Sequence, residues 1–387
     1  MLVRSQPGAP EKWKNSRAWL NSAKPFFFAY GIYTESTRQL DRVIPCRKKV
    51  SNAFDSSSQL FISVWIVLLH GATVIPVIQP SVIYVADWPE DPEHPRYPEG
   101  AREKSALFPP DPLPFDFIKP ARRYLFKLSD PRYPEQFWAE TIAYVVGCLL
   151  NVEVPPAYIA VHREREVCGA LIEWFFVDGE QSFIAGGNRL QRLVPDYDRK
   201  RGTQHSFQLV QRACIRASRD GLTDDWLLYW GRAFLFDALI GNTDRHQDNW
   251  GFLAWTLPDG ITTRERLAPL FDNGTSLGME RHLQHVADWD DNRCAAYLGR
   301  GRHHMKINTD DAARCQHLDM VKYMIESHPA LKAPLQETLA LFSIEELEQR
   351  LAELCRLDLP VKLGEARIRF TLKLVNLRYR QLCAILS

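Results

Sequence analysis

The 387-residue chain lacks several features that would assign a protein to a class at once. Its formal net charge is only +1, so bulk charge gives no support to nucleic-acid binding. None of its eight cysteines forms a C-x-x-C pair, which argues against a zinc ribbon or a thioredoxin-like motif. Scattered single cysteines in a long chain are typical of a reducing compartment. We therefore expect a cytoplasmic protein without direct nucleic-acid binding.

Charged residues are also missing from one long segment. Residues 60–85 contain no Asp, Glu, Lys or Arg, and the run is long enough to span a bilayer as a helix. The alternative is one or two buried strands, because Ile, Val and Phe dominate and Gly71, Pro76 and Pro80 interrupt the run. Basic residues precede the run and acidic ones follow it, so a spanning helix would place the rest of the chain outside the cell. We favour strands, and expect membrane contact only through residues 60–85.

Methionine is absent between Met1 and Met279. The first 80 or so residues also show little periodicity. These two observations suggest the hypothesis that the native protein begins near Val82 or Val85 at a non-ATG codon. A proline-rich acidic stretch begins at Asp87 and is typical of an exposed connector, so we place a domain boundary there.

A strand and a helix in the middle of the chain carry one charged residue each at apolar positions. The strand lies within residues 121–128 and contains Lys127, and the helix begins near Tyr133 and contains Glu140. A lysine buried without an anionic partner is costly, so Lys127 requires one. Strand lysine followed by helix glutamate is the order in which protein kinases orient the α- and β-phosphates of ATP. A purely structural ion pair, or a lysine that reaches solvent, is the alternative.

Two further strands are predicted over residues 154–161 and 167–176. In a two-lobed kinase the end of such a strand becomes the hinge, whose backbone groups bind adenine. Glu173, Trp174 and Phe175 occupy that position here. The end of an ordinary core strand would show the same pattern.

The most specific signal lies between residues 235 and 274. A helical pattern stops at Gly241, as at a helix C-cap, and Asp244 is followed five residues later by Asn249. Strands over residues 250–256 and 267–271 then predict a hairpin that ends in Asp272-Asn273-Gly274.

This spacing suits phosphoryl transfer, which needs a carboxylate for the proton of the attacking hydroxyl and oxygen ligands for Mg²⁺. Asp244 would be the base, and Asn249 and Asp272 would be the metal ligands, as in the D-x-x-x-x-N and D-x-G motifs of protein kinases. His246 and Arg245 would brace the loop. The alternative is an Asp- and Asn-rich turn beside a plain hairpin.

The segments GNTDRHQDNW and LAPLFDNG resemble the C-terminal domain of HipA-like kinases. YLFKL resembles the nucleotide-lysine strand of that family, and residues 139–157 resemble its next helix and strand. The resemblance covers about residues 96–280. The family's phosphate-covering loop, G-A-Q-E-K, is matched by Gly100, Ala101, Arg102, Glu103, Lys104 and Ser105.

The resemblance implies an α+β protein with a two-lobed protein-kinase-like fold. A small antiparallel-sheet N-lobe over residues 86–176 and a mostly helical C-lobe over residues 177–387 would follow the uncertain segment 1–85. ATP and Mg²⁺ would be used to phosphorylate a Ser or Thr hydroxyl of a protein, and Ser105 of the chain itself is one candidate. Asp244 would then be catalytic and Lys127 would bind phosphate.

Departures from the family leave alternatives open. Arg102 stands where the family usually has glutamine, Asp272-Asn273-Gly274 stands where protein kinases have D-F-G, and a proline-rich insertion fills residues 108–120. The D-R-H-x-x-N pattern is also similar to phosphatidylinositol kinases, and a non-catalytic nucleotide-binding module would keep the same residues. The substrate and an antitoxin-like regulator stay open.

The remainder is predicted to be a helical scaffold. One helix would run from Thr309 to about Ser327, another would follow a capping box of Ser343 and Glu346, and an amphipathic helix would span residues 361–385. His and Cys residues scattered over 282–317 do not fall at zinc-finger spacings, so we expect loop and helix-surface residues and no zinc site.

Overall fold

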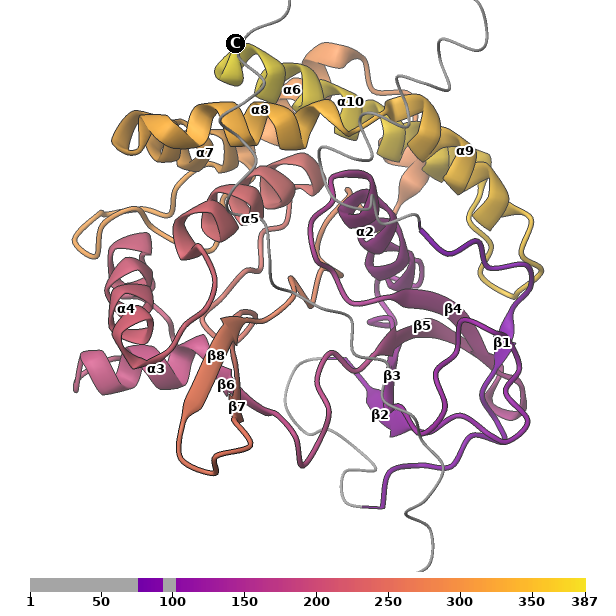
Figure 1. Ribbon diagram of the computed structural model, residues 1–387. Coiled ribbons are helices and arrows are strands. Elements are labelled where there is room, and N and C mark those ends of the chain that lie inside the picture. Colours follow the sequence, from indigo (N-terminus) through magenta and orange to yellow (C-terminus); the bar gives the residue numbers. More distant parts are fainter. Residues whose placement is uncertain (1–75, 93–101) are drawn as a thin grey trace, which may run out of the picture. The chain divides into compact units, whose positions relative to one another are not determined.

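The computed structural model describes residues 76–92 and 102–387 (Figure 1). Its N-terminal lobe is built on a five-stranded sheet in the order β1-β4-β5-β3-β2. Neighbouring strands are antiparallel except β1 and β4, which are parallel. The small, largely antiparallel sheet predicted for this lobe is therefore present. The strands are β1 (Ile83–Tyr84), β2 (Lys104–Leu107), β3 (Tyr124–Leu128), β4 (Ala157–His162) and β5 (Val167–Glu173).

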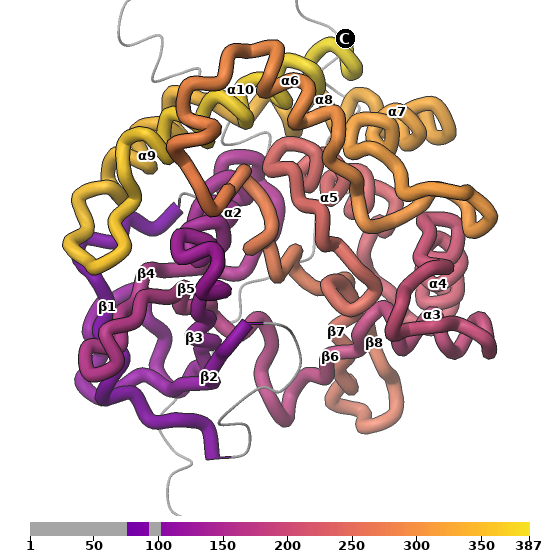
Figure 2. Tube along the Cα trace, turned by 180° about the vertical axis from the view of Figure 1, so that it is seen from behind, coloured from indigo at the N-terminus to yellow at the C-terminus, as the bar shows by residue number. Residues whose placement is uncertain are grey.

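Helix α2 (Phe137–Leu149) packs against β4 and β5 on one side and against α9 (Ile344–Cys355) and α5 (Trp226–Ile240) on the other. All of its residues from Phe137 to Cys148 are buried. A helix that is apolar around its whole circumference is one that is enclosed on all sides. Figure 2 shows α2 between the sheet and the C-terminal helices. Glu140 is therefore carried into the interior by the helix that joins the two lobes.

Residues on the N-terminal side of the predicted boundary at 85 belong to this sheet. β1 pairs with β4, and the side chain of Gln79 both accepts from the backbone N–H of Ile159 and donates to its carbonyl, at 2.8 and 2.7 Å. The side-chain amide of Gln79 thereby makes the same pair of hydrogen bonds with β4 that the backbone of a neighbouring strand would make. In the described part of the chain, the strand predicted within residues 60–85 is confirmed only for β1; residues 60–75 lie outside that part. Over the same part, no helix combines the length and apolar character needed to cross a bilayer.

The C-terminal lobe combines helices with a three-stranded antiparallel sheet in the order β6-β7-β8. Helix α5 is its centre, and every residue from Ala233 to Ile240 is buried. Asp225 caps the start of α5, and Gly241 ends it in the left-handed conformation predicted for a C-cap. The other elements are α3 (Gly186–Leu193), α4 (Phe207–Asp220), α6 (Asp291–Arg300), α7 (His317–Ser327), α8 (Lys332–Ala340), α10 (Glu365–Leu386), β6 (Ser182–Ala185), β7 (Gly251–Thr256) and β8 (Thr263–Leu267).

The hairpin after the Asp244 loop returns earlier than predicted. Asp259 accepts the backbone N–H groups of Ile261 and Thr262 and so makes a tight turn, and pairing resumes at once in β8. Of the predicted return strand, residues 267–271, only Leu267 belongs to β8. The N–H of Ala268 still donates to Gly251 of β7, whereas that of Leu270 donates to the carbonyl of Glu153. The chain therefore turns toward the N-terminal lobe just before Asp272.

Three predicted helix starts were also too early. The helix predicted from Tyr133 begins at Phe137, because residues 131–136 form turns around two prolines. The helix predicted from Thr309 begins at His317, because Asp311 accepts the backbone N–H of Asn308 and makes a local turn. The last helix begins after Gly364 rather than at residue 361. The cap at Ser343 is confirmed, since its hydroxyl accepts from the N–H of Glu346.

The cysteines and histidines of the C-terminal lobe are more deeply placed than predicted. Cys294, His303 and His317 are buried, where the sequence indicated loop or surface positions. The cysteines of the described ranges are all free thiols. No group of His, Cys, Asp or Glu suited to a metal ion occurs within residues 76–92 and 102–387.

Candidate active site

Four side chains from four separate segments meet where the lobes join. The ammonium of Lys127 on β3 lies 2.8 Å from Glu140 Oε1 on α2 and 2.5 Å from Asp272 Oδ1. The guanidinium of Arg102 bridges the same two carboxylates, at 3.1 Å from Glu140 and 3.0 Å from Asp272. Two cations and two anions thus balance one another. Both the kinase interpretation and a structural ion pair predict the contact between Lys127 and Glu140.

The second oxygen of Glu140 holds the backbone of the Asp-Asn-Gly segment. Glu140 Oε2 accepts the N–H of Asn273 at 2.9 Å. Burial alone would raise the pKa of Glu140, but Lys127 and Arg102 hold that pKa below its usual range. Burial acts in the same direction on Asp272, and the same two cations hold the pKa of Asp272 well below its usual range. Both carboxylates are therefore charged at neutral pH.

Asp272 combines a partly exposed carboxylate with an unusual backbone. Its side chain keeps 29% of its surface exposed, in contrast to 3% for Glu140. Its φ angle is +55°, in the left-handed region that non-glycine residues seldom adopt. Such conformations concentrate at functional sites, where the surrounding structure enforces them.

Arg245 builds the loop that carries Asp244. Its side chain is fully buried and forms a two-pronged ion pair with Asp237 of α5, at 2.7 and 3.0 Å. Its Nη1 donates to the carbonyls of Asn249 and Phe271, at 3.2 and 2.5 Å. One atom thus holds both the loop after Asp244 and the residue before Asp272. The predicted role of Arg245 as a brace describes this arrangement, but its partners were not predicted.

Two buried histidines support the same loop from α7 and the segment before it. His303 Nδ1 accepts the backbone N–H of Met305 at 3.1 Å, so its Nε2 carries the proton and donates to Asp237 at 3.2 Å. His317 Nε2 donates to the carbonyl of Asn242 at 2.6 Å. Sequence analysis missed these contacts, because 66 and 75 positions separate the partners.

The loop itself is shaped by short-range hydrogen bonds. The Asn242 side chain accepts the N–H of Asp244 at 2.9 Å, and Asn249 Nδ2 donates to the carbonyl of Asp244 at 2.7 Å. The second bond occupies the amide nitrogen of Asn249; the amide oxygen is the atom a metal would take. The Asp244 side chain is half-buried, and burial raises the pKa of its carboxyl while the neighbouring His246 lowers it.

These residues suit a magnesium ion by their chemistry. Asp272 and Asn249 supply hard oxygen ligands, which Mg²⁺ prefers, and Mg²⁺ takes only one or two protein carboxylates because it keeps waters and substrate phosphates in its shell. The two backbones meet at the single Nη1 atom of Arg245. Lys127 and Arg102 occupy Oδ1 of Asp272, so a metal would compete with them for that carboxylate.

Backbone groups of the predicted hinge are already hydrogen-bonded within the sheet. The N–H of Glu173 donates to Pro156 and that of Trp174 to Arg123. The carboxylate of Glu173 is buried and pairs with Lys119 at 2.6 Å. Sheet pairing therefore uses the N–H of Trp174, and adenine contact stays a prediction for Glu173, Trp174 and Phe175. The ring of Phe175 stacks on that of Phe271 with centroids 4.9 Å apart.

The predicted phosphate-covering loop lies only partly in the described chain. Gly100 and Ala101 are outside it. Lys104 and Ser105 belong to β2, where Ser105 pairs with Phe126, so this end of the segment is a strand and not a loop. Glu103 is exposed and pairs with Arg165 at 2.6 Å. Within the described part of the segment, Arg102 contacts Asp272 directly, and the charge of Lys104 also lowers the pKa of Asp272.

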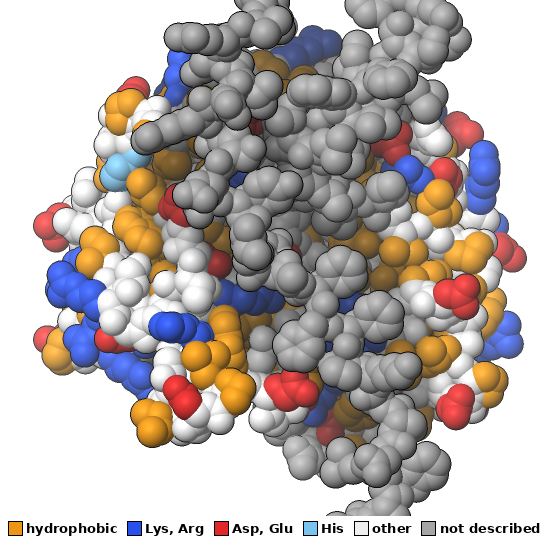
Figure 3. Space-filling view, in the orientation of Figure 1, with side chains coloured by type: hydrophobic (Ala, Val, Ile, Leu, Met, Phe, Trp, Pro, Cys, Tyr) orange, Lys and Arg blue, Asp and Glu red, His pale blue; other side chains and the backbone are white. Residues whose placement is uncertain are grey.

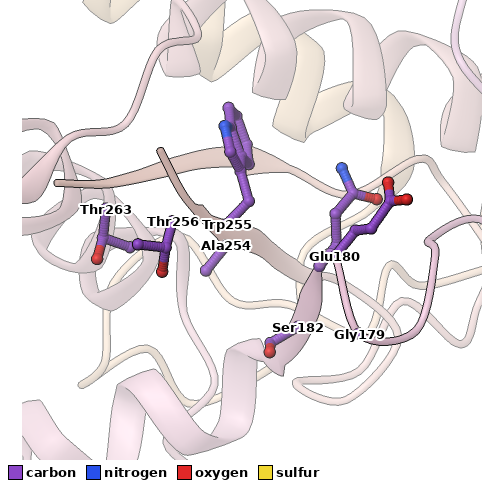
Figure 4. A pocket seen from close by; sticks show the side chains of 8 residues that line it. Gly179, Glu180, Ser182, Ala254, Trp255, Thr256 and Thr263 are labelled. Carbon is purple, nitrogen blue, oxygen red and sulfur yellow. The ribbon is translucent and has the colours of Figure 1, made fainter. Parts of the chain in front are cut away.

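Two larger cavities lie in the described part of the chain. One of about 670 Å³ lies beside β6, β7 and β8 and contains none of the predicted residues; Figure 4 shows it with Glu180 and Trp255 on its wall. Another of about 540 Å³ is lined by Thr243 and Gly274, the neighbours of Asp244 and of the Asp-Asn pair. The second opens beside the predicted base and is the better candidate for an acceptor group.

Comparison with known proteins agrees with this architecture. The sequence profile of the HipA-like C-terminal domain matches residues 98–353, about two thirds of the chain. A search of curated proteins found no match. Among solved structures, the Helicobacter pylori proinflammatory kinase CtkA is similar with a TM-score of 0.62 at 15% identity, covering 79% of this chain and 97% of CtkA.

A second solved structure is a complex of HipA, HipB and operator DNA from a toxin–antitoxin system of Shewanella oneidensis MR-1. It shares 14% identity, with a TM-score of 0.41 and coverage of 76% of this chain and 65% of that one. The likeness to CtkA shows the kinase-like fold predicted from the sequence, and the profile match together with it supports a kinase.

Proposed function

We propose, from the premise that the chain belongs to the HipA-like C-terminal domain family, that it is an ATP- and Mg²⁺-dependent kinase acting on a Ser or Thr hydroxyl of a protein. The observation that carries the proposal is that the ammonium of Lys127 lies within 2.8 Å of both Glu140 and Asp272, beside the loop of Asp244. Kinases need this combination of a phosphate lysine, its glutamate and a metal aspartate.

In this proposal each group has one task. Lys127, held by Glu140, binds phosphate oxygens of ATP. Asp272 and Asn249 hold Mg²⁺, which supplies positive charge to the phosphates when bound. Asp244 accepts the proton of the acceptor hydroxyl as its oxygen bonds to the γ-phosphorus. The bond from that phosphorus to the bridging oxygen breaks, and ADP leaves with the electron pair.

The raised pKa of Asp244 suits this role. A general base is most effective when its pKa approaches the working pH, and burial moves Asp244 in that direction. Arg245 and Asp237 act indirectly, because they fix the backbone segments that carry Asp244, Asn249 and Asp272. His246 adjoins the base and lowers its pKa.

The test is incubation of the full chain with γ-labelled ATP and Mg²⁺, in the presence of a protein mixture and of phosphatidylinositol vesicles. We expect label on protein, including the chain itself, and a loss of about 10²- to 10⁴-fold in Asp244→Ala, the usual contribution of a general base. Label in lipid alone would establish the lipid-kinase alternative. ATP binding without phosphoryl transfer, both in the unmodified chain and in Asp244→Ala, would favour a non-catalytic module.

Ser105 is accessible to a separate test. Its side chain is only partly buried, but its backbone is paired in β2. Mass spectrometry of the labelled chain should place phosphate on Ser105 if self-phosphorylation occurs there, and label should persist in Ser105→Ala if another residue is the acceptor. The regulator and the cytoplasmic location stay predictions. Membrane contact also stays one, because residues 60–75 lie outside the described chain.

A further inference from the structure

A third, smaller cavity adjoins the Asp244 loop. It has a volume of about 240 Å³. The rings of His304 on its wall and His246 on the loop have centroids 5.7 Å apart. On the opposite wall, a Cβ added to Gly202 would lie 2.4 Å from the side chain of Gln247. The cavity is thus in contact with the two residues after Arg245. Its lining is Gly202, Thr203, His205, His304, Lys306, Ala312 and Arg314.

Hydrogen bonds determine which nitrogens of the two lining histidines carry protons. Arg314 can only donate, so His304 Nε2, 2.9 Å from its Nη2, must be an acceptor. The indole N–H of Trp250 likewise donates to His205 Nε2 at 3.2 Å. A neutral imidazole with an accepting Nε2 carries its proton on Nδ1. Both rings therefore have an Nδ1–H.

Those two N–H groups face each other without an acceptor between them. The Nδ1 atoms of His205 and His304 are 3.4 Å apart, and two donors cannot bond to one another. His205 is buried, so leaving its N–H unpaired is costly. An oxygen atom in the cavity, to one side of the two nitrogens and about 2.9 Å from each, would accept both N–H groups. The arrangement calls for an acceptor.

The charges around the cavity favour an acceptor that is negative. Among the described residues, Lys306 and Arg314 line it and no carboxylate does. Burial lowers the pKa of His304 to about 3, and the side chains that lower it further are all basic: Arg314, His246 and His303. The surface over α3 and α4, beside this cavity, also gathers Lys and Arg side chains, at the left of Figure 3. The charged side chains that line the cavity, Lys306 and Arg314, are thus both positive.

We propose that this cavity is an oxyanion-binding site that receives a carboxylate or phosphate group of the acceptor substrate. The Nδ1–H groups of His205 and His304 would donate to its oxygens, and Lys306 and Arg314 would balance its charge. The role of this site rests on the proposed kinase function. An acidic or phosphorylated residue bound here would position a neighbouring hydroxyl of the substrate at Asp244. Substrates with an anionic residue close to the acceptor would then be selected.

The first arm of the test measures anion binding without any transfer. Inorganic phosphate is titrated into the full chain by calorimetry, and into a Lys306→Gln, Arg314→Gln double variant shown by circular dichroism to be folded. We expect the double variant to bind phosphate at least about tenfold more weakly, the loss typical of a charge-assisted contact. Arg302→Gln is the matched control, an exposed arginine of the same segment outside the lining, and should bind as the unmodified chain does. Equal binding by the double variant would overturn the proposal.

The second arm measures selection. Serine peptides carrying aspartate, phosphoserine or alanine at varied distances from the acceptor are offered with ATP. We expect the unmodified chain to prefer an anionic peptide by about tenfold in kcat/KM, and the double variant to lose that preference while binding ATP normally. Preference for aspartate alone would identify the carboxylate source, and for phosphoserine alone the phosphate source. Transfer without any anionic preference would overturn the role in selection. Phosphate binding with no transfer to any peptide would refute the kinase function and leave the anion site standing.

Discussion

Arg102 should compete with magnesium for Asp272, and its removal should tighten metal binding. Its guanidinium contacts Asp272 at 3.0 Å and Glu140 at 3.1 Å. A hydrogen bond to a charged group contributes about 1.5–3 kcal/mol net, and about 1.4 kcal/mol corresponds to a tenfold change in affinity. Because the Asp272 side chain is 29% exposed and partly screened, we take the lower end of that range. Arg102→Gln should therefore lower the Mg²⁺ concentration needed for half-maximal ADP binding by about tenfold.

The assay is calorimetric titration of ADP at a series of Mg²⁺ concentrations, which requires no phosphoryl transfer. Arg132→Gln is the matched control, because Arg132 is 71% exposed and pairs only with its neighbour Asp130. It should leave the magnesium dependence unchanged. A magnesium requirement that stays the same or rises in Arg102→Gln would refute the reasoning, and would mean that Arg102 helps to bind the nucleotide instead of opposing the metal.

Three other perturbations test the scaffold, each by urea denaturation. Arg245→Met should lower the free energy of unfolding by about 3–5 kcal/mol, because the buried carboxylate of Asp237 loses its arginine partner. Arg216→Met, at an exposed ion pair 3.9 Å long, should change it by less than about 0.5 kcal/mol, and similar losses in the two variants would contradict the account. Burial and nearby basic groups lower the pKa of His317 to about 3, so below about pH 6.5 this histidine takes up a proton in the unfolded chain before it does so in the folded chain. Between pH 7 and pH 5, His317 should therefore lower the free energy of unfolding by about 2 kcal/mol. His317→Gln should abolish that share of the loss. Gly241→Ala and Gly260→Ala both place a side chain at positive φ, which costs about 1–2 kcal/mol. Of the two variants, Gly241→Ala should lose more stability, because its new Cβ meets Arg378. Equal losses would show that this contact relaxes freely.

Local patterns predicted much of the chain because their causes are local. The C-cap at Gly241 needs a residue that tolerates positive φ, and the cap at Ser343 needs a hydroxyl before a helical repeat; both are visible within a few residues. A charged residue in an apolar strand, Lys127, demands a partner, and the next buried helix offers Glu140. The order of such signals indicated a kinase, and the resemblance to HipA-like kinases implied the kinase-like fold.

The parts that were missed depend on contacts between distant segments. Nothing near Arg102 indicates that its guanidinium reaches Asp272, 170 positions away. His303 and His317 looked like surface residues because their partners, Asp237 and Asn242, belong to another helix and its end. The observed ends of several strands and helices differ from the predicted ends for a similar reason. Residues 267–271 are apolar enough for a strand, yet pairing with β7 ends at Ala268, and the N–H of Leu270 donates to Glu153 instead.

The central claim is that one cluster divides binding and chemistry between Asp272 and Asp244. The most direct measurement compares Asp244→Asn and Asp272→Asn in the full chain, with calorimetry for Mg²⁺-dependent ATP binding and γ-labelled ATP for transfer. The account predicts that Asp244→Asn binds ATP with unchanged affinity but transfers at least about 10²-fold more slowly, while Asp272→Asn loses magnesium-dependent binding. Transfer that survives in Asp244→Asn, or magnesium-dependent ATP binding that survives in Asp272→Asn, would contradict it.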